Sequence, residues 1–242
     1  MTEPSIPAKP AATVMLLRDT DAGIEVFMLR RTTSAAFAGG MYVFPGGKVD
    51  EADGSGDPGY VIAAIRECFE EAGVLLARDE GGMAVVDGHR ALTHRHDVHD
   101  GTVDLVALCR QHGLRPAIED LVWVSRWVTP VGESARRFDT RFFIAVAPAG
   151  QTSTHDDNET IASTWIRPTD ALQRETSGEL TMMPPTIKSL EYLAAHRDSA
   201  AVMHAARQLD RPVAIMPRLR RNAVGRITGV SLPGDDDYAD LV

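Results

Sequence analysis

The chain has 242 residues, of which 44% are hydrophobic and 24% are charged, as in an ordinary globular protein. Its formal net charge of −9 argues against a general nucleic-acid or membrane-surface binder, because such proteins carry basic surfaces. No apolar run approaches the roughly 18 residues of a membrane span, and no signal-peptide pattern is evident. We therefore expect a cytoplasmic protein with neither nucleic acid nor membrane as its partner.

The N-terminal region predicts a short lead-in followed by a β-hairpin. Residues 1–10 contain three prolines and predict a disordered lead-in, so we expect one domain over residues 11–242. Apolar runs over residues 12–18 and 24–31 flank a polar turn, which is the pattern of two paired strands.

A short strand over residues 41–44 leads into the turn Pro45-Gly46-Gly47. A helix follows, which we expect to begin at Pro58 with Asp57 as its N-cap and to stop at Gly73.

Three carboxylates crowd about one turn of this helix. Glu67, Glu70 and Glu71 lie three or four positions apart and therefore share a face. The one cation nearby in the sequence is Arg66. A hard divalent cation such as Mg²⁺ or Mn²⁺ would relieve the repulsion, because these ions favour carboxylate oxygens. Taken alone, an acidic helix is also compatible with a solvated face.

The run Arg-Glu-Cys-Phe-Glu-Glu-Ala-Gly-Val, preceded by Gly-Gly, resembles the Nudix box G-x5-E-x7-R-E-U-x-E-E-x-G-U, where U is aliphatic. Its second half matches from Arg66 to Val74, with Cys68 in place of the aliphatic residue. Its first half departs from the pattern. Gly47 to Arg66 spans 19 positions where the family has 14, and Asp53 lies six positions after Gly47, where the family has glutamate.

This resemblance implies an α+β fold, the α/β/α Nudix sandwich with a mixed sheet between helices. It also implies an enzyme that hydrolyses a nucleoside diphosphate linked to another moiety, with Mg²⁺ or Mn²⁺. By position, Glu67 and Glu71 would be the principal metal ligands, and Glu70 a further ligand or an aid in activating water. Arg66 would hold the carboxylates, and the Gly47 carbonyl would ligate metal.

A further catalytic acid is expected on a downstream loop. Glu159, six positions before Trp165, matches the family best, although an exposed acidic loop fits equally well. Candidate substrate-binding cations are Arg30, Arg31 and Arg141. Strand alternation leaves open whether Arg141 faces a cleft or solvent.

Segments outside the box are similar to the branch that includes peroxisomal coenzyme A diphosphatases. They include residues 29–53 and the Pro-Pro-Thr segment before a late helix. The branch implies coenzyme A or acyl-CoA as the favoured substrate. ADP-ribose, NADH or another nucleotide is the alternative, and a non-catalytic nucleotide-sensing module is a third hypothesis. Family members often dimerise, so a homodimer is a further expectation.

The rest of the chain predicts helices around further strands. A helical insertion is expected over about residues 78–117, and its histidines, among them His99, favour a solvated surface or a substrate lid over a metal site. Strands are expected over 121–129, 137–148 and 160–167. Helices are expected over 168–174, 184–195 and 199–209. The C-terminal helical extension is expected over about 184–242, with short extended pieces over 213–218 and 225–231.

Overall fold

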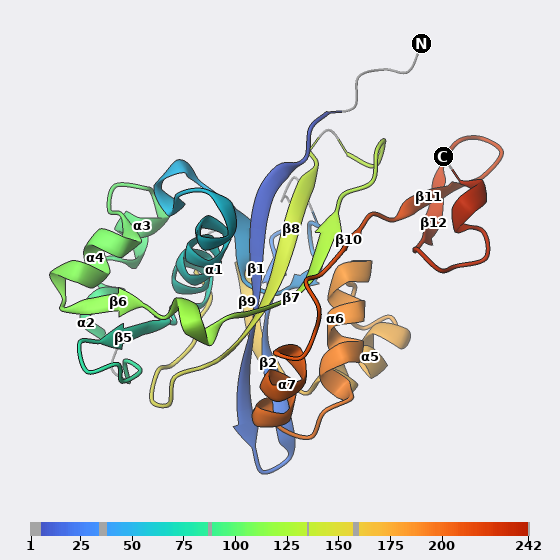
Figure 1. Cartoon of the computed structure of the whole chain (residues 1–242). Coiled ribbons are helices and arrows are strands. Elements are labelled where there is room, and N and C mark those ends of the chain that lie inside the picture. Colours follow the sequence, from blue (N-terminus) through green and yellow to red (C-terminus); the bar gives the residue numbers. More distant parts are fainter. Residues whose placement is uncertain (1–5, 34–37, 87–88, 135, 157–159, 242) are drawn as a thin grey trace.

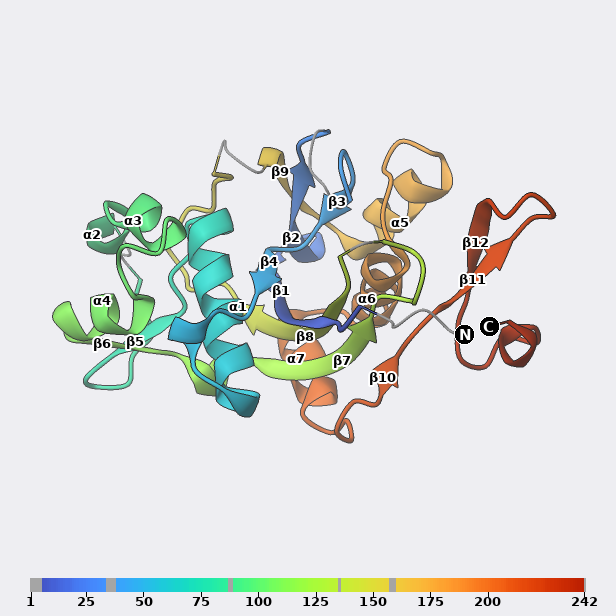
Figure 2. The same ribbon diagram turned by 90° about the horizontal axis from the view of Figure 1, so that it is seen from above.

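The computed structural model describes residues 6–33, 38–86, 89–134, 136–156 and 160–241. A mixed eight-stranded sheet stands in the middle of the molecule, with helices covering both of its faces (Figure 1). The view from above shows the same layers, with α1 on one side of the sheet and α5 and α6 on the other (Figure 2). The predicted α+β class, a mixed sheet between helices, is confirmed.

The strand order follows from pairings that are distant in the sequence. β1 pairs in parallel with β8 and antiparallel with β2, and β10 pairs in parallel with β7. β4 adds to β1, and β9 adds to β2. Along the sheet the strands are β10 (Ala214–Ile215), β7 (Val122–Val128), β8 (Phe138–Val146), β1 (Lys9–Thr20), β2 (Gly23–Arg31) and β3 (Tyr42–Val43), with β4 (Gly46–Lys48) and β9 (Thr160–Ile166) beside them.

Strand β1 shows why the sheet needs helices on both faces. Alternate residues of a strand point to opposite faces. Val14 and Leu16 pack into one hydrophobic cluster with α1, whereas Met15 and Leu17 pack into a second cluster with α6 and α7. All four side chains are fully buried, so the middle of the strand is apolar on both faces rather than alternating.

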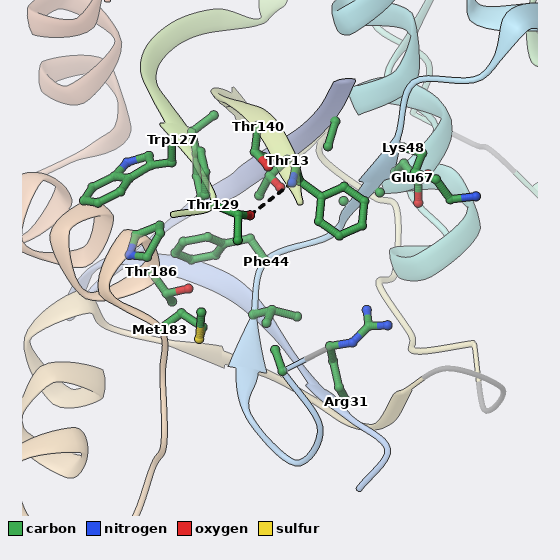
Figure 3. A pocket seen from close by; sticks show the side chains of 18 of the residues that line it. Thr13, Arg31, Phe44, Lys48, Glu67, Trp127, Thr129, Thr140, Met183 and Thr186 are labelled. Atoms are coloured by element: carbon green, nitrogen blue, oxygen red, sulfur yellow. Dashed lines mark hydrogen bonds between the residues drawn. The ribbon is translucent and has the colours of Figure 1, made fainter. Parts of the chain in front are cut away.

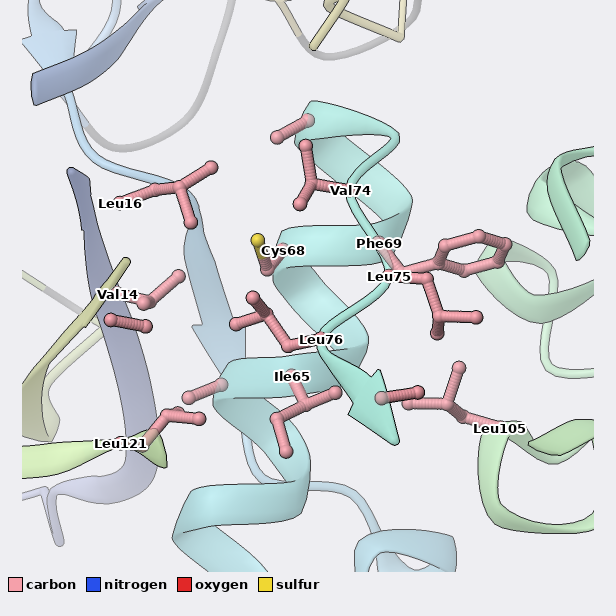
Figure 4. Close-up of a cluster of buried hydrophobic side chains, with 14 of the residues drawn as sticks. Val14, Leu16, Ile65, Cys68, Phe69, Val74, Leu75, Leu76, Leu105 and Leu121 are labelled. Carbon is pink, nitrogen blue, oxygen red and sulfur yellow. The ribbon is translucent and has the colours of Figure 1, made fainter. Parts of the chain in front are cut away.

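Helix α1 (Gly56–Ala72) is the centre of the first cluster, where Ile65, Cys68 and Phe69 are fully buried (Figure 4). It begins at Gly56 with Ser55 at the N-cap position, two residues before the predicted start. Asp57 is therefore not the N-cap; it lies in the first turn and binds Arg141. The predicted stop is confirmed, since Gly73 has left-handed backbone torsion angles and its N–H bonds the Phe69 carbonyl.

The insertion beyond α1 combines short helices with a small sheet. β5 and β6 pair antiparallel and close the base of the segment. The predicted helical insertion is helical in part, and its longest helix is α4. The elements are β5 (Ala77–Asp79), α2 (His89–Leu92), α3 (Arg95–His99), α4 (Leu105–Gln111) and β6 (Leu114–Pro116), followed by a one-turn 3-10 helix at Ile118–Asp120. Another one-turn 3-10 helix, Glu51–Asp53, lies before α1.

The opposite face of the sheet is covered by α5 (Pro168–Thr176), α6 (Pro184–Ala194) and α7 (Ser199–Ala206). The predicted C-terminal extension is helical only as far as Ala206, apart from one 3-10 turn at Tyr238–Asp240. Beyond it lies the hairpin of β11 (Arg218–Arg221) and β12 (Ile227–Ser231), which projects from the sheet (Figure 1).

The start of the chain also differs from the prediction. Strand β1 already begins at Lys9, inside the segment predicted as lead-in, because Lys9 and Pro10 pair with β8. Among the described helices, none combines the length and the apolar character that crossing a lipid bilayer requires.

Candidate active site

Arg66 is the hub of the acidic face of α1. Its Nη1 donates to Oε1 of Glu67 at 2.9 Å and to Oε1 of Glu70 at 3.0 Å. Its Nη2 donates to the Lys48 carbonyl at 2.8 Å. These contacts tie the helix to β4 and hold two of the three carboxylates in place.

Asp53 is the third acidic side chain that is hydrogen-bonded to this guanidinium. It accepts two hydrogen bonds from Arg66, each of 2.9 Å, and its side chain is 2% exposed. Such a two-point pair matches the fork geometry of arginine. Asp53 thus belongs to the buried network, and it stands six positions after Gly47, where the family pattern has glutamate. The extra residues form the turn at Gly54 and the first turn of α1.

Strand β4 brings the glycine turn against the carboxylates. The Gly46 N–H donates to Oε2 of Glu71 at 2.8 Å. A Cβ atom on Gly47 would lie 2.3 Å from Oε1 of Glu67, a distance that no real contact allows. The absence of a side chain at residue 47 is therefore required for Glu67 to occupy its position.

Burial disfavours the ionised form of the carboxylates on α1. Each is less than a tenth exposed. Burial raises the pKa of Glu67 to about 8, against the opposing effect of Arg66. Burial also raises the pKa of Glu70. Desolvated anionic oxygens of this kind favour a cation as an additional partner.

The chemistry of these donors suits a hard divalent cation, because they are carboxylate oxygens beside a backbone turn. Arg66 occupies one oxygen each of Glu67 and Glu70, and Gly46 occupies one oxygen of Glu71. As the side chains stand in the described residues, no group of three His, Cys, Asp or Glu residues is arranged to hold a metal ion. Metal binding would therefore use the remaining carboxylate oxygens after side-chain rotation.

A cavity of about 680 Å³ opens beside these carboxylates. Figure 3 shows Glu67, Lys48 and Arg31 on one side of it, and Trp127, Phe44 and Met183 on the other. The cavity thus has a charged end and a largely apolar end. The lining also includes the apolar residues Phe138, Phe142, Pro184, Pro185, Pro217 and Val230, the hydroxyls of Thr13, Thr129, Thr140 and Thr186, and the charged Glu133 and Arg136.

The candidate substrate-binding arginines are separated by the fold. Arg31 lines the cavity, and its Nη1 lies 3.9 Å from Oε1 of Glu71. Arg30 and Arg141 are not among the described residues that line it. Glu159, the predicted downstream acid, lies outside the described residues.

Arg141 lies on the other face of β8, toward the start of α1. Its guanidinium is 3.8 Å from the ring centroid of Tyr60 and 4.3 Å from that of Trp123. It also donates to Asp57 at 2.7 Å. These contacts connect α1 to β7 and give Arg141 a packing role in the fold.

Two groups at the site have no clear signal in the sequence. His99 lines the cavity next to Glu70, but nothing in its spacing distinguishes it from the neighbouring histidines. Pro217 and Val230 reach the cavity from the C-terminal segment, and nothing in that part of the sequence indicates a contact with the carboxylate site. Only the placement of distant segments reveals either contribution.

The mixed sheet between helices, with a row of carboxylates on α1 beside a cavity, is the architecture of a Nudix hydrolase. A family model described as the NUDT19 Nudix domain matches residues 55–193. The chain therefore belongs to the Nudix family, in its NUDT19 branch, and is a pyrophosphohydrolase.

Individual relatives agree with this assignment. The acyl-coenzyme A diphosphatase NUDT19 of Xenopus laevis is 28% identical over 275 residues, covering 89% of this chain and 72% of the relative. Its Gallus gallus counterpart is 29% identical over 226 residues, covering 69% of this chain and 60% of that protein. The crystal structure of a NUDIX hydrolase from Alicyclobacillus acidocaldarius superposes with a TM-score of 0.73. It is 32% identical and covers 82% of this chain and 96% of that chain.

Proposed function

We propose that this protein hydrolyses the pyrophosphate bond of coenzyme A or acyl-CoA with the help of Mg²⁺ or Mn²⁺. The observation that carries the proposal is the cavity with two chemistries, carboxylates and basic groups at one end and an apolar wall at the other. The products would be adenosine 3′,5′-bisphosphate and a 4′-phosphopantetheine or its acyl derivative.

The charged end suits the reacting pyrophosphate. Glu67, Glu70 and Glu71 would hold the metal ions, with the Gly47 carbonyl as a further ligand. When bound, such an ion neutralises phosphate charge and lowers the pKa of water. Arg66 holds the carboxylates in orientation, and Arg31 would bind the phosphates.

The hydrolysis also needs a general base that takes the proton from the attacking water. Glu70 and Glu71 are candidates within the described site, and Glu159 stays a candidate from the sequence alone. Substitution of each of the three by glutamine would identify which one takes the proton.

The apolar end suits a long, weakly polar arm. Ligand cavities commonly have volumes of about 300–1,000 Å³, and this one lies within that range. Trp127, Phe44, Phe142 and Met183 offer the contacts that an acyl-pantetheine chain would use, whereas a purely nucleotide substrate has no such segment. The names of the Xenopus laevis and Gallus gallus relatives point to the same substrate class.

A substrate panel tests the proposal. Coenzyme A, medium-chain and long-chain acyl-CoA, ADP-ribose, NADH and nucleoside triphosphates would be incubated with Mg²⁺, with Mn²⁺ and with EDTA, and the products resolved by mass spectrometry. We expect coenzyme A compounds to be cleaved fastest and EDTA to stop the reaction. Faster cleavage of ADP-ribose or NADH would keep the chemistry and overturn the substrate.

Two variants make the test specific for the site. Glu71→Gln removes the charge of a carboxylate at the cavity, and Glu191→Gln removes one from the exposed surface of α6. We expect the first to lose activity and the second to keep it. Absence of turnover with the whole panel would favour a nucleotide-binding role.

A further inference from the structure

The insertion between α1 and β7 reaches the carboxylate cluster through helix α3. Arg95 and His99 lie four positions apart on this helix and therefore share one face. That face is turned toward α1, because Arg95 donates to the Glu70 carbonyl at 2.7 Å. Among the described residues, α3 thus brings a charged and a titratable side chain to the end of the catalytic helix.

Arg95 fixes the position of α3 on the core. Besides the Glu70 carbonyl, it donates to the Thr154 carbonyl at 2.9 Å. Its Nη1 lies 3.2 Å from where a Cβ on Gly73 would stand, so the guanidinium covers the C-terminal end of α1. A cation in this place is favourable for the helix dipole as well. The insertion is therefore held in a defined place rather than loosely attached.

With α3 held in this way, His99 lies beside the side chain of Glu70. Its Nδ1 is 3.6 Å from Oε2 of Glu70, and the imidazole lines the cavity. Nδ1 is buried and has no hydrogen-bond partner among the described residues. The separation exceeds a hydrogen bond by a few tenths of an ångström, which a small rotation of either side chain closes.

Glu70 is thereby approached from two sides. Arg66 donates to Oε1 at 3.0 Å, and His99 is the basic group nearest to Oε2 in the described contacts. The neighbouring histidines have other partners: His94 lies 3.2 Å from Asp97, and His96 lies 3.1 Å from Asp100. His99 alone among these three lines the cavity.

We propose that His99 is a positioning residue of the hydrolysis, which orients the second oxygen of Glu70 while Arg66 orients the first. The proposal rests on the pyrophosphohydrolase activity, but not on coenzyme A as the substrate. It gives the insertion a function, because its helix α3 completes the support of a carboxylate on α1. Groups that orient a metal-binding or reacting carboxylate commonly contribute about 10–100-fold to affinity or activity.

The test compares His99→Ala, His99→Asn and His96→Ala with the wild-type chain, on the best substrate of the panel. Asparagine keeps a donor near the position of Nδ1, and His96 is an exposed control on the same helix. We expect His99→Ala to lower kcat about 10–100-fold with little change in KM. His99→Asn should recover most of the loss, and His96→Ala should match the wild type.

Glu70→Gln supplies the coupling test. If His99 acts through Glu70, His99→Ala should have little further effect in the Glu70→Gln background. Unchanged kcat in His99→Ala, no recovery with His99→Asn, or a fully additive double variant would each overturn the proposal.

Mn²⁺ titration by calorimetry provides a readout that needs no turnover. We expect His99→Ala, but not His96→Ala, to weaken Mn²⁺ binding about tenfold. Equal affinities would contradict the proposal. An inactive wild type would count against the proposed function instead, and the titration would still decide the role of His99.

Discussion

Asp53 and Arg66 form a buried two-point ion pair that joins the turn before α1 to the acidic face of this helix. Both hydrogen bonds measure 2.9 Å, and the Asp53 side chain is 2% exposed. The pair leaves Nη1 of Arg66 directed at Glu67 and Glu70. Asp53 thus controls the orientation of two carboxylates without contacting either of them through a hydrogen bond.

We expect Asp53→Asn to lower the free energy of unfolding by about 3 kcal/mol, because it leaves a buried guanidinium without its main anion. Asp50→Asn is the matched control. Asp50 lies 3.5 Å from the same guanidinium, but its side chain is 59% exposed. Its loss should change stability by less than about 0.5 kcal/mol. Urea unfolding of both variants measures these changes. An equal loss of unfolding free energy in the two variants would show that burial of Asp53 does not strengthen its ion pair.

Gly47→Ala is expected to reduce kcat/KM about 100-fold, because the new Cβ would displace the Glu67 carboxylate by the order of an ångström. Gly229→Ala serves as the control, since no atom lies within 4 Å of a Cβ at that residue. Steady-state kinetics on the best substrate would show the difference. Wild-type activity in Gly47→Ala would mean that Glu67 does not need its observed position.

Mn²⁺ should raise the melting temperature of the wild-type protein. At about 100 times its dissociation constant, a ligand stabilises the folded state by about 2.7 kcal/mol, which for this chain length is roughly 5–10 °C. Glu67→Gln should abolish most of the shift, whereas Glu191→Gln on the exposed side of α6 should retain it. If Mn²⁺ raised the melting temperature equally in all three proteins, the ion would bind at a site that does not include Glu67.

Arg31 and Arg141 should respond oppositely to substitution. Arg31→Gln is expected to raise KM about tenfold, since it removes a charged hydrogen-bond donor from the cavity wall. Arg141→Gln should leave KM unchanged and lower stability by about 1–2 kcal/mol, since it loses contacts with Tyr60, Trp123 and Asp57. Kinetics and thermal unfolding on both variants separate the roles. A raised KM in Arg141→Gln would show instead that Arg141 contributes to substrate binding.

Neither cysteine should react with a thiol reagent in the folded protein. Both side chains are buried, and burial raises the pKa of the Cys68 thiol as well as that of Cys109, the latter to about 11. At pH 8 both are therefore protonated and shielded from solvent. We expect Ellman's reagent to label two thiols only after denaturation. Rapid labelling of the native protein would show that one of the two helices opens readily.

The local features of this protein were determined by its sequence. The spacing of Glu67, Glu70 and Glu71 places them on one helix face, because helical periodicity depends only on separation along the chain. The stop at Gly73 follows from the conformational freedom of glycine. Most strand and helix positions follow from short apolar patterns in the same way, and the Nudix resemblance supplied the sheet between helices.

Tertiary structure alone decided which groups meet at the cavity. Arg31 and Arg141 look equivalent in the sequence, yet Arg31 lines the cavity near Glu71, whereas Arg141 packs on Tyr60 and binds Asp57 at the start of α1. Asp53 reaches Arg66 from the turn before α1, and His99 reaches Glu70 from the insertion. Such contacts depend on how separate elements pack together, and no periodicity within a single segment encodes that packing.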